Sequence, residues 1–510
     1  MTVSDVREAF FQGEFERALA LADTVPVDDE ATRYELTLLR ARTLIRLDQA
    51  DRAVELLRAH SFSESGLDAS TTAQMLLGAA YIRLGQLDRA LTLLRDALQH
   101  AGDVHPTIRA ELMLNLGIAS FRLNDFSEAS RALGEVPPDA DIVHARALEY
   151  VGWIAWAEGD YPSAARAFHD TLVALRASTH ADRYVEAWAL YGLTMLAPEL
   201  LLVSDWAVLE QWLRRFDWSV SGVAQVRFWT LIASALMYEA LGDVRAAREA
   251  ARRAEELGAD PGYRVVAFCR LAATFRAIGE HEAHAEFLGR ARSAYDALNV
   301  RDLPTDLRLV PLYLAEESVS GGDVDAAAAL LVRYREVVAP SAQPSARELE
   351  RWSAMADSIE ARIRLARCDE QGAIPLFASA FQTFSTQQYR RRAAALALSL
   401  ARLTGKKRYE RYAEDALREV APRYWMAREL AELRGAGAPA LTPTESEILA
   451  LVVRGRTYKE IAAKRDVSWK TVGNHVQALF RKFGVRSRAE LAAEALRLRI
   501  VSVEPRRNAS

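Results

Sequence analysis

Cysteine is nearly absent from this chain of 510 residues. Its two cysteines, Cys269 and Cys368, stand far apart, with no CxxC pair and no pair of histidines at the spacing of a zinc site. The HEAH stretch at His281 and His284 places its histidines three positions apart, whereas a zinc-binding helix of the HExxH type needs four. We therefore expect neither disulfides nor a metal site, and both cysteines should be small buried apolar side chains.

Long apolar runs and a secretion signal are missing as well. No stretch reaches the roughly 18 apolar residues that a membrane-spanning helix needs. The start, MTVSDVREAFFQGEF, has no basic segment followed by an apolar one. These absences predict a cytoplasmic protein with no membrane partner.

The motifs of several enzyme and sensor domains are also absent. No GxxxxGK[ST] sequence occurs, which argues against a P-loop for ATP. No alternation of strand and helix patterns precedes residue 435, so we expect neither a receiver domain nor an α/β ligand-binding domain. No nucleophile, base and orienting residue stand out as a set. We therefore expect no catalytic residues and no cofactor.

Lysine is missing from the first four hundred residues, and the distribution of charge divides the chain in two. All six lysines lie between residues 406 and 482. From residue 436 onward there are 14 Lys plus Arg against 7 Asp plus Glu, a balance of +7, and the formal net charge of -4 leaves -11 for residues 1–435. We expect a large acidic part and a small basic part that meets a polyanion.

What the sequence does contain is a repeat. An apolar helix, a short turn and a second helix rich in alanine recur, as in AYIRLGQLDRALTLL and AWAEGDYPSAARAF. The equivalent turn positions are Gly13, Asp48, Gly85, Asn124, Gly159, Gly242, Gly279, Gly322, Cys368 and Gly405. Their gaps are 35 to 46 residues, except one of 83 that has room for two units, one of them degenerate. Such a period predicts stacked helix hairpins.

Three positions in each repeat explain how its two helices pack. The turn residue supplies a positive φ, and a large residue two positions later, such as Phe15 or Tyr161, fills the gap between the helices. Small alanines let the second helix pack closely on the first: Ala18, Ala90, Ala129 and Ala164. The pattern resembles the tetratricopeptide repeat family, which implies a superhelix that binds proteins, peptides or small ligands.

Tryptophan is concentrated around the degenerate unit. Seven of the ten tryptophans lie there: Trp153, Trp156, Trp188, Trp206, Trp212, Trp218 and Trp229. They predict either a pocket for a ligand or partner on the concave face, or large side chains that fill an irregular joint between two halves of the solenoid. The sequence leaves both alternatives open.

The segment GAGAPA at 435–440 predicts a flexible linker. Beyond it, the sequence contains clear signals for helix starts. Three pairs have the spacing of capping boxes, and Ser468 caps a further helix; the pairs are Thr442 with Glu445, Thr457 with Glu460, and Ser487 with Glu490. Four helices are predicted at 443–454, 458–464, 469–483 and 488–499. The second and third form a helix-turn-helix. The fold class is thus all-α, with a tetratricopeptide-like helical-hairpin solenoid at 1–434 and a four-helix domain at 441–510.

The third of these helices has two faces. Its apolar stripe is Val472, Val476, Leu479 and Phe483, which should pack on Ile448, Leu451 and Ile461. The opposite stripe is Lys470, Asn474, Gln477 and Arg481. Amides can pair with the edge of adenine in a major groove, while flanking cations hold phosphates. This face predicts a reader of double-stranded DNA.

The run LTPTESEILALVVRGRTYKEIAAKRDVSWKTVGNHVQALFRKFGVRSRAEL resembles the DNA-binding domain of LuxR-type transcription factors, with its LTxxE, KEIA, TVxNHV and GVxSR features. The resemblance implies a homodimer on DNA and RNA polymerase as a further partner. It places Asn474 and Gln477 at bases. Around the phosphates, or positioning the helix, it places Lys459, Ser468, Trp469, Lys470, Thr471, Val472, His475, Lys482 and Arg488, with Arg481 joining them from the exposed stripe.

Three residues depart from the family pattern. They are Thr444, usually arginine; Arg465, usually a buried leucine; and Gly473, usually a long side chain beside the groove. Arg465 must extend to solvent or leave a gap, and Gly473 costs about 1 kcal/mol of helix stability relative to alanine. We predict a sequence-specific transcriptional regulator whose solenoid senses a signal. The alternative is a protein-interaction scaffold with a weakened head.

Overall fold

The computed structural model describes residues 1–60, 62, 66–100, 104–178, 182–220, 223–258, 263–298, 309–337, 346–434 and 441–497, and within these ranges it contains helices and no strand. The chain forms two compact units, Met1–Leu396 and Ala397–Ser510. The boundary predicted after residue 434 falls inside the second unit, and the proposed linker at 435–440 lies outside the described residues.

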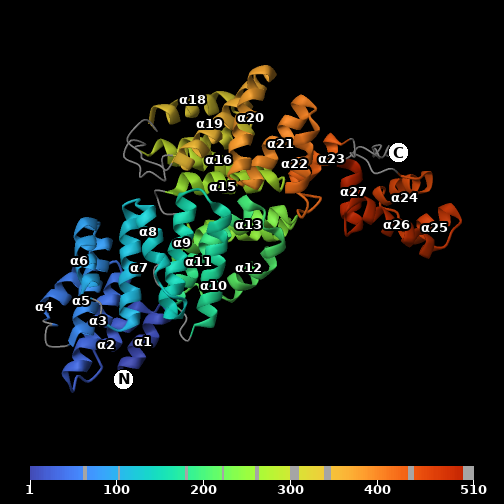
Figure 1. Ribbon diagram of the computed structural model, residues 1–510. Helices are drawn as coiled ribbons and strands as arrows, with labels where there is room; N and C mark the ends of the chain where they lie inside the picture. The colour runs from blue at the N-terminus through green and yellow to red at the C-terminus, as the bar shows by residue number, and fades with distance from the viewer. Residues whose placement is uncertain are drawn as a thin grey trace. The chain divides into compact units, whose positions relative to one another are not determined.

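Ten antiparallel helix hairpins make up the first unit (Figure 1). Their helices are α1 (Val3–Phe11) and α2 (Phe15–Ala22), α3 (Glu30–Arg46) and α4 (Ala50–Ala59), α5 (Gly66–Arg83) and α6 (Leu87–Gln99), α7 (Pro106–Arg122) and α8 (Phe126–Gly134), α9 (Ile142–Ala157) and α10 (Tyr161–Ala177), α11 (Arg183–Leu200) and α12 (Val203–Arg215), α13 (Ala224–Ala240) and α14 (Val244–Leu257), α15 (Arg264–Ala277) and α16 (His281–Asp296), α17 (Val310–Ser320) and α18 (Val324–Val337), and α19 (Ala346–Ala366) and α20 (Glu370–Thr386). Helix α21 (Arg390–Thr404) crosses into the second unit, where α22 (Lys407–Ala416) and α23 (Trp425–Leu433) follow. The all-α hairpin solenoid predicted from the sequence is confirmed.

The turn positions inferred from the repeat are confirmed by the backbone. All ten have a positive φ, including the three that are not glycine: Asp48 at 59°, Asn124 at 61° and Cys368 at 63°. The long gap between Gly159 and Gly242 contains a further turn at Leu201, with φ of 54°. Leucine rarely adopts this conformation, because its Cβ crowds the backbone. The degenerate unit is therefore a real hairpin, α11–α12, closed by a residue that the sequence pattern does not mark.

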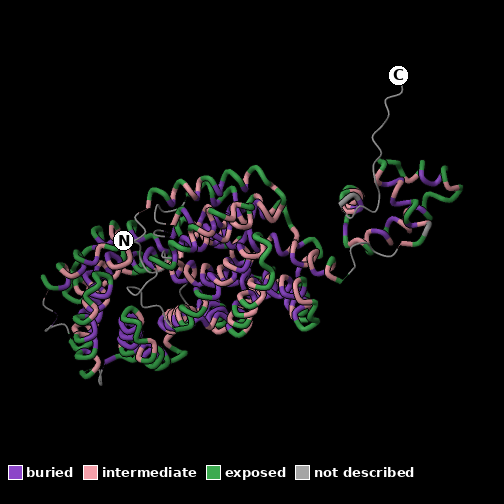
Figure 2. Tube along the Cα trace, turned by 90° about the horizontal axis from the view of Figure 1, so that it is seen from above, coloured by how far each residue is buried: buried purple, intermediate pink, exposed green. Residues whose placement is uncertain are grey.

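A buried alanine lets the two helices of a hairpin pack closely. Five positions after the turn residue, eight of the hairpins carry an alanine with no exposed surface: Ala18, Ala53, Ala90, Ala129, Ala164, Ala247, Ala327 and Ala373. A methyl group is small enough for the backbones of the paired helices to approach closely. In Figure 2 the buried residues of this unit lie where the helices face one another, and the exposed residues follow their outer sides. The hydrophobic core therefore runs along the solenoid as successive clusters.

One expectation about cysteine is wrong. Cys269 is buried in α15, as predicted, but Cys368 is exposed. It occupies the left-handed turn between α19 and α20, where the chain reverses at the surface. The position demands a backbone conformation rather than an apolar side chain.

Buried ion pairs tie α21 to helices far away in the sequence. Arg392 donates to both carboxylate oxygens of Glu316 on α17, at 3.1 and 3.2 Å. Burial alone would raise the pKa of Glu316, but Arg392 and Arg362 outweigh it and lower the pKa to about 2. Arg391 lies 3.9 Å from Glu199 on α11. The start of α21 is thereby held against the middle of the solenoid.

Candidate nucleic-acid interface

Four helices close the chain: α24 (Pro443–Val453), α25 (Tyr458–Arg465), α26 (Trp469–Phe483) and α27 (Arg488–Arg497). Their starts follow from the caps. Thr442 accepts the N–H of Glu445 at 3.2 Å while Glu445 accepts the N–H of Thr442 at 2.8 Å, and Thr457 and Glu460 repeat this exchange. Each box satisfies two backbone donors at its helix start, so two of the three predicted boxes are confirmed. In the third, Glu490 accepts the N–H of Arg486 instead of that of Ser487.

The remaining two starts differ in detail. Ser468 accepts the N–H of Thr471 at 3.0 Å, and Ser487 accepts the N–H of Glu490 at 3.2 Å. Glu490 takes the N–H of Arg486 at 2.9 Å. Asp466, with φ of 53°, ends α25 in the left-handed conformation and turns the chain into α26. This tight turn sets the angle between the two helices of the helix-turn-helix.

One face of α26 forms the centre of a separate hydrophobic core. Val472, Val476 and Leu479 have no exposed surface, and Phe483 packs against them partly buried. They contact Ile448 and Leu451 of α24 and Ile461 of α25, together with Leu491 and Ala495 of α27. The apolar stripe predicted from the sequence is thus the inner face of the helix, and it fixes which side of α26 points outward.

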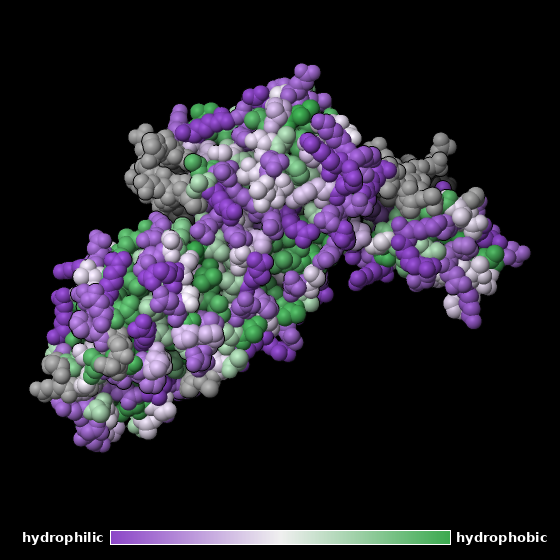
Figure 3. Space-filling model, viewed as in Figure 1, coloured by the Kyte–Doolittle hydropathy of each residue, from purple (hydrophilic) through white to green (hydrophobic). Residues whose placement is uncertain are grey.

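The outer face of α26 carries four polar side chains in a row. Lys470, Asn474, Gln477 and Arg481 are all exposed. Within the described residues, none of the four side chains has a hydrogen bond or ion pair. In Figure 3 hydrophilic residues dominate the surface over α25 and α26. Two amides between two cations, all without internal partners, form a row that can bind a groove and its phosphates.

The other predicted contact residues fall into two groups. Lys459, Ser468, Trp469, Lys470 and Thr471 are exposed at the first turns of α25 and α26, and the indole of Trp469 is 56% exposed. The Ser468 and Thr471 hydroxyls lie 2.8 Å apart, within the cap. His475 is half-buried. The side chains of the first group are therefore accessible at the starts of the two helices of the helix-turn-helix.

The second group is engaged inside the domain. Lys482 donates to Glu445 at 2.6 Å, and Arg488 donates to the backbone carbonyl of Arg456 and lies over the ring of Tyr458 at 5.6 Å. These contacts join α26 to α24 and α27 to the start of α25. They could not be predicted from helical periodicity, because they connect separate helices. Roles at phosphates for both residues stay predictions.

The structure shows the surroundings of two residues that depart from the family pattern, Arg465 and Gly473. Arg465 is half-buried and pairs with Glu447 of α24, so its side chain reaches to the surface and finds a carboxylate. Gly473 lies in the middle of α26, and a Cβ added there would meet no atom within 4 Å. The glycine is therefore not required by packing within the domain.

The seven tryptophans do not share one cavity. Trp153 and Trp188 line an inner groove, Trp206 and Trp212 line a second cavity on α12, and three pack elsewhere. Trp156 meets Tyr161 edge to face, Trp218 meets Phe216, and Trp229 lies between Phe228 and Tyr263. A ligand site among them stays a prediction.

The inner groove consists of two adjoining cavities of about 460 and 330 Å³, lined by the first helices of six successive hairpins. Arg83 and Arg122 reach it without a carboxylate partner among the described residues, and Arg146 interacts there with Asp182 and Glu149. Burial and the nearby Arg46 lower the pKa of Arg146. Burial raises the pKa of Glu149, beside it, to about 7. This charge arrangement favours an anion in the groove.

An α-helical solenoid that carries a helix-turn-helix with an outward polar row is the architecture of a DNA-binding regulator. Residues 439–495 match the family described as bacterial regulatory proteins, luxR family, and residues 81–148 match the tetratricopeptide repeat. The spore germination protein GerE of Bacillus subtilis is 42% identical over 60 residues, which are 12% of this chain and 81% of GerE. The chain belongs to the luxR family.

The other similarities are partial or distant. The probable transcriptional regulatory protein NarL of Mycobacterium tuberculosis is 38% identical over 76 residues, covering 15% of this chain and 35% of NarL. The crystal structure of apo RapI is similar to 80% of this chain and 99% of RapI, with 12% identity and a TM-score of 0.38. Among the described helices, none is long and apolar enough to span a bilayer.

Proposed function

We propose that this chain is a sequence-specific transcriptional regulator in which α26 lies in the major groove of double-stranded DNA. The observation that carries the proposal is the outer row of α26, whose four side chains are exposed and unpaired among the described residues. Asn474 and Gln477 read base edges, and Lys470 and Arg481 hold the flanking phosphates. Residues 441–510 form the DNA-binding head, which acts in the cytoplasm as a homodimer and contacts RNA polymerase.

The solenoid, residues 1–434, is the sensing or partner-binding part of this regulator. Its inner groove supports a partner with acidic groups, because two arginines there, Arg83 and Arg122, lack carboxylate partners in the described part of the chain. Anions bound by unpaired guanidinium groups replace lost hydration with charge-assisted hydrogen bonds. The chain acts by binding rather than by catalysis.

A capture experiment on the full chain tests the proposal. Genomic fragments retained by the protein should share one motif, and retention should fall steeply as salt is raised. The second candidate function, a protein-interaction scaffold with a weakened head, is favoured by Gly473, which removes a side chain beside the groove. The scaffold function is supported if the full chain retains no duplex at any salt concentration.

A further inference from the structure

The α11–α12 hairpin breaks the packing rule of the solenoid. Eight hairpins place an alanine five positions after the turn residue, whereas this one places Trp206 five positions after Leu201. The indole is only 2% exposed, so it is inserted between helices rather than turned outward. A side chain of this size keeps α12 from approaching its neighbours as closely as an alanine would. Space is left beside α10 and α11.

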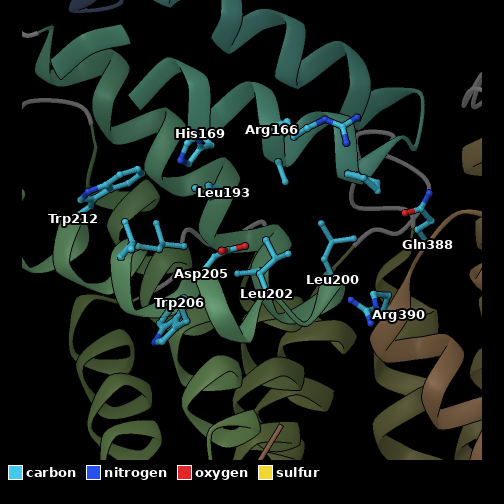
Figure 4. Close-up of a pocket in the computed structure, with 15 residues that line it drawn as sticks. Arg166, His169, Leu193, Leu200, Leu202, Asp205, Trp206, Trp212, Gln388 and Arg390 are labelled. Atoms are coloured by element: carbon cyan, nitrogen blue, oxygen red, sulfur yellow. The ribbon is translucent and has the colours of Figure 1, made fainter. Parts of the chain in front are cut away.

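That space is the second cavity, with a volume of about 400 Å³ (Figure 4). This is within the range of cavities that bind small molecules. Its apolar lining comes from α10, α11, the turn and α12: Pro162, Ala165, Leu193, Ala197, Leu200, Leu202, Trp206, Val208, Leu209 and Trp212. In Figure 3 hydrophobic residues gather on the surface over α12 and its neighbours. Val208 is 50% exposed, so the cavity opens to solvent beside it.

Five polar residues complete the lining, and their charges are unequal. Arg166, Arg390 and His169 supply donors, and Asp205 is the one carboxylate. Arg166 donates to the hydroxyl of Ser163 at 2.9 Å and pairs with no carboxylate among the described residues. Figure 4 shows Arg166, Gln388 and Arg390 along one side of the cavity, with Trp212 at the opposite end. The guanidinium of Arg166, which has no carboxylate partner within the described chain, favours an anionic group on that side.

We propose that this cavity binds a small ligand with an apolar or aromatic body and one carboxylate. The body lies against Leu193, Trp206 and Leu209, and the carboxylate lies at the guanidinium of Arg166. The proposal deepens the sensing role of the solenoid and rests on it. It commits to a small molecule because the cavity is bounded on several sides by helices rather than extended along the solenoid.

The cavity also touches the helix through which a signal could leave. Gln388 and Arg390 belong to the turn and first residue of α21, and α21 continues across the boundary into the second unit. Gln388 has φ of 58°, an uncommon conformation for a residue with a side chain. A ligand in the cavity therefore lies against the start of α21. Binding should slow hydrogen exchange in α12 and at residues 390–394.

Calorimetry on the full chain tests the proposal with two acids, 4-phenylbutyrate and octanoate, and their primary amides. We expect one site per chain, a dissociation constant for the better acid below about 1 mM, and amides about tenfold weaker. Equal binding of acids and amides, or no binding of either acid, overturns the assignment.

Variants locate the site. Val208→Trp narrows the opening at an exposed position, and Arg166→Gln removes an exposed charge, so both should fold; each should weaken acid binding about fivefold or more. Arg252→Gln, on the exposed face of α14, is the matched control and should change nothing. Unchanged affinity in Val208→Trp overturns the location. DNA retention by the full chain is measured separately. Retention of DNA without ligand binding would contradict this site alone, whereas loss of DNA retention would contradict the proposed function.

Discussion

Lys482 on α26 donates to Glu445 on α24 at 2.6 Å, and the same carboxylate accepts the N–H of Thr442 at the start of its own helix. One buried glutamate thus caps α24 and clamps the helix that we place in the groove. The hydrogen bond from Lys482, followed by that from Thr442, lowers the pKa of Glu445 to about 2. This contact adds to the hydrophobic core in holding α26 against α24.

The first prediction concerns this clamp. Glu445→Gln and Lys482→Ala should each lower the melting temperature of the head in the full chain, followed by circular dichroism and by proteolysis within 441–497. Because the folded pKa of Glu445 lies below its ordinary value of 4.5, the stability it provides is present above pH 4.5 and is lost as pH falls toward 2. Glu445→Gln should show no such loss in that window.

DNA binding by Lys482→Ala separates the two roles of this lysine. If the clamp is its main role, affinity corrected for the folded fraction should change little. A loss of affinity in fully folded protein would instead assign Lys482 a phosphate contact.

The second prediction concerns Lys470, which is exposed and unpaired within the described chain. Lys470→Ala should weaken specific and random duplexes alike and reduce the slope of log affinity against log salt by about 1. Gel retention across a salt series measures both. Lys406→Ala, outside the helix-turn-helix, is the control. An unchanged slope in Lys470→Ala would remove this residue from the interface.

The third prediction uses the glycine in α26. Gly473→Ala should stabilise the head by about 1 kcal/mol, because alanine restricts the unfolded chain and the added methyl meets no atom within 4 Å. Ala478→Gly, on the same helix, should have the opposite effect. Chemical unfolding of the full chain, read from the head transition, gives both values. A destabilised Gly473→Ala would mean that the backbone there is strained in a way the open space does not reveal.

The fourth prediction concerns the inner groove. Burial raises the pKa of Glu149 to about 7, with the hydrogen bond from Trp153 and the charge of Arg146 opposing it. The unfolded chain releases this proton near pH 4.5 and the folded chain only near pH 7, so stability should fall across that window by up to about 3 kcal/mol. Glu149→Gln should abolish that decline in unfolding measured at several pH values. Parallel pH profiles for both proteins would show that Glu149 ionises normally.

Much of the fold could be predicted because its requirements are local. A positive φ is needed wherever a hairpin reverses, and the repeat located Asp48, Asn124 and Cys368 although none is glycine. The turn at Leu201 was not predicted, because leucine rarely adopts the left-handed conformation and does so here only in the context of the folded chain. The burial of Cys368 was predicted from the general tendency of cysteine to be buried, whereas its turn position, which the repeat had located, is exposed.

The head shows the same division. The two faces of α26 follow from helical periodicity, so Val476 and Asn474 could be assigned to opposite sides from their spacing. The partner of Lys482 could not, because Glu445 lies 37 residues away and the capping pattern already accounts for it. Arg465 was expected to leave a gap or reach solvent, and the structure shows it reaching Glu447. Contacts between separate helices cannot be inferred from the periodicity of either helix alone.

The most direct test of the account compares wild type with Asn474→Ala on the motif selected by the full chain and on a random duplex of equal length. If Asn474 reads a base, the variant should lose about 1 to 3 kcal/mol of affinity for the motif and almost none for the random duplex, at one fixed salt concentration. Equal losses on both duplexes, or no loss on either, would contradict the assignment of the outer face of α26 to base recognition.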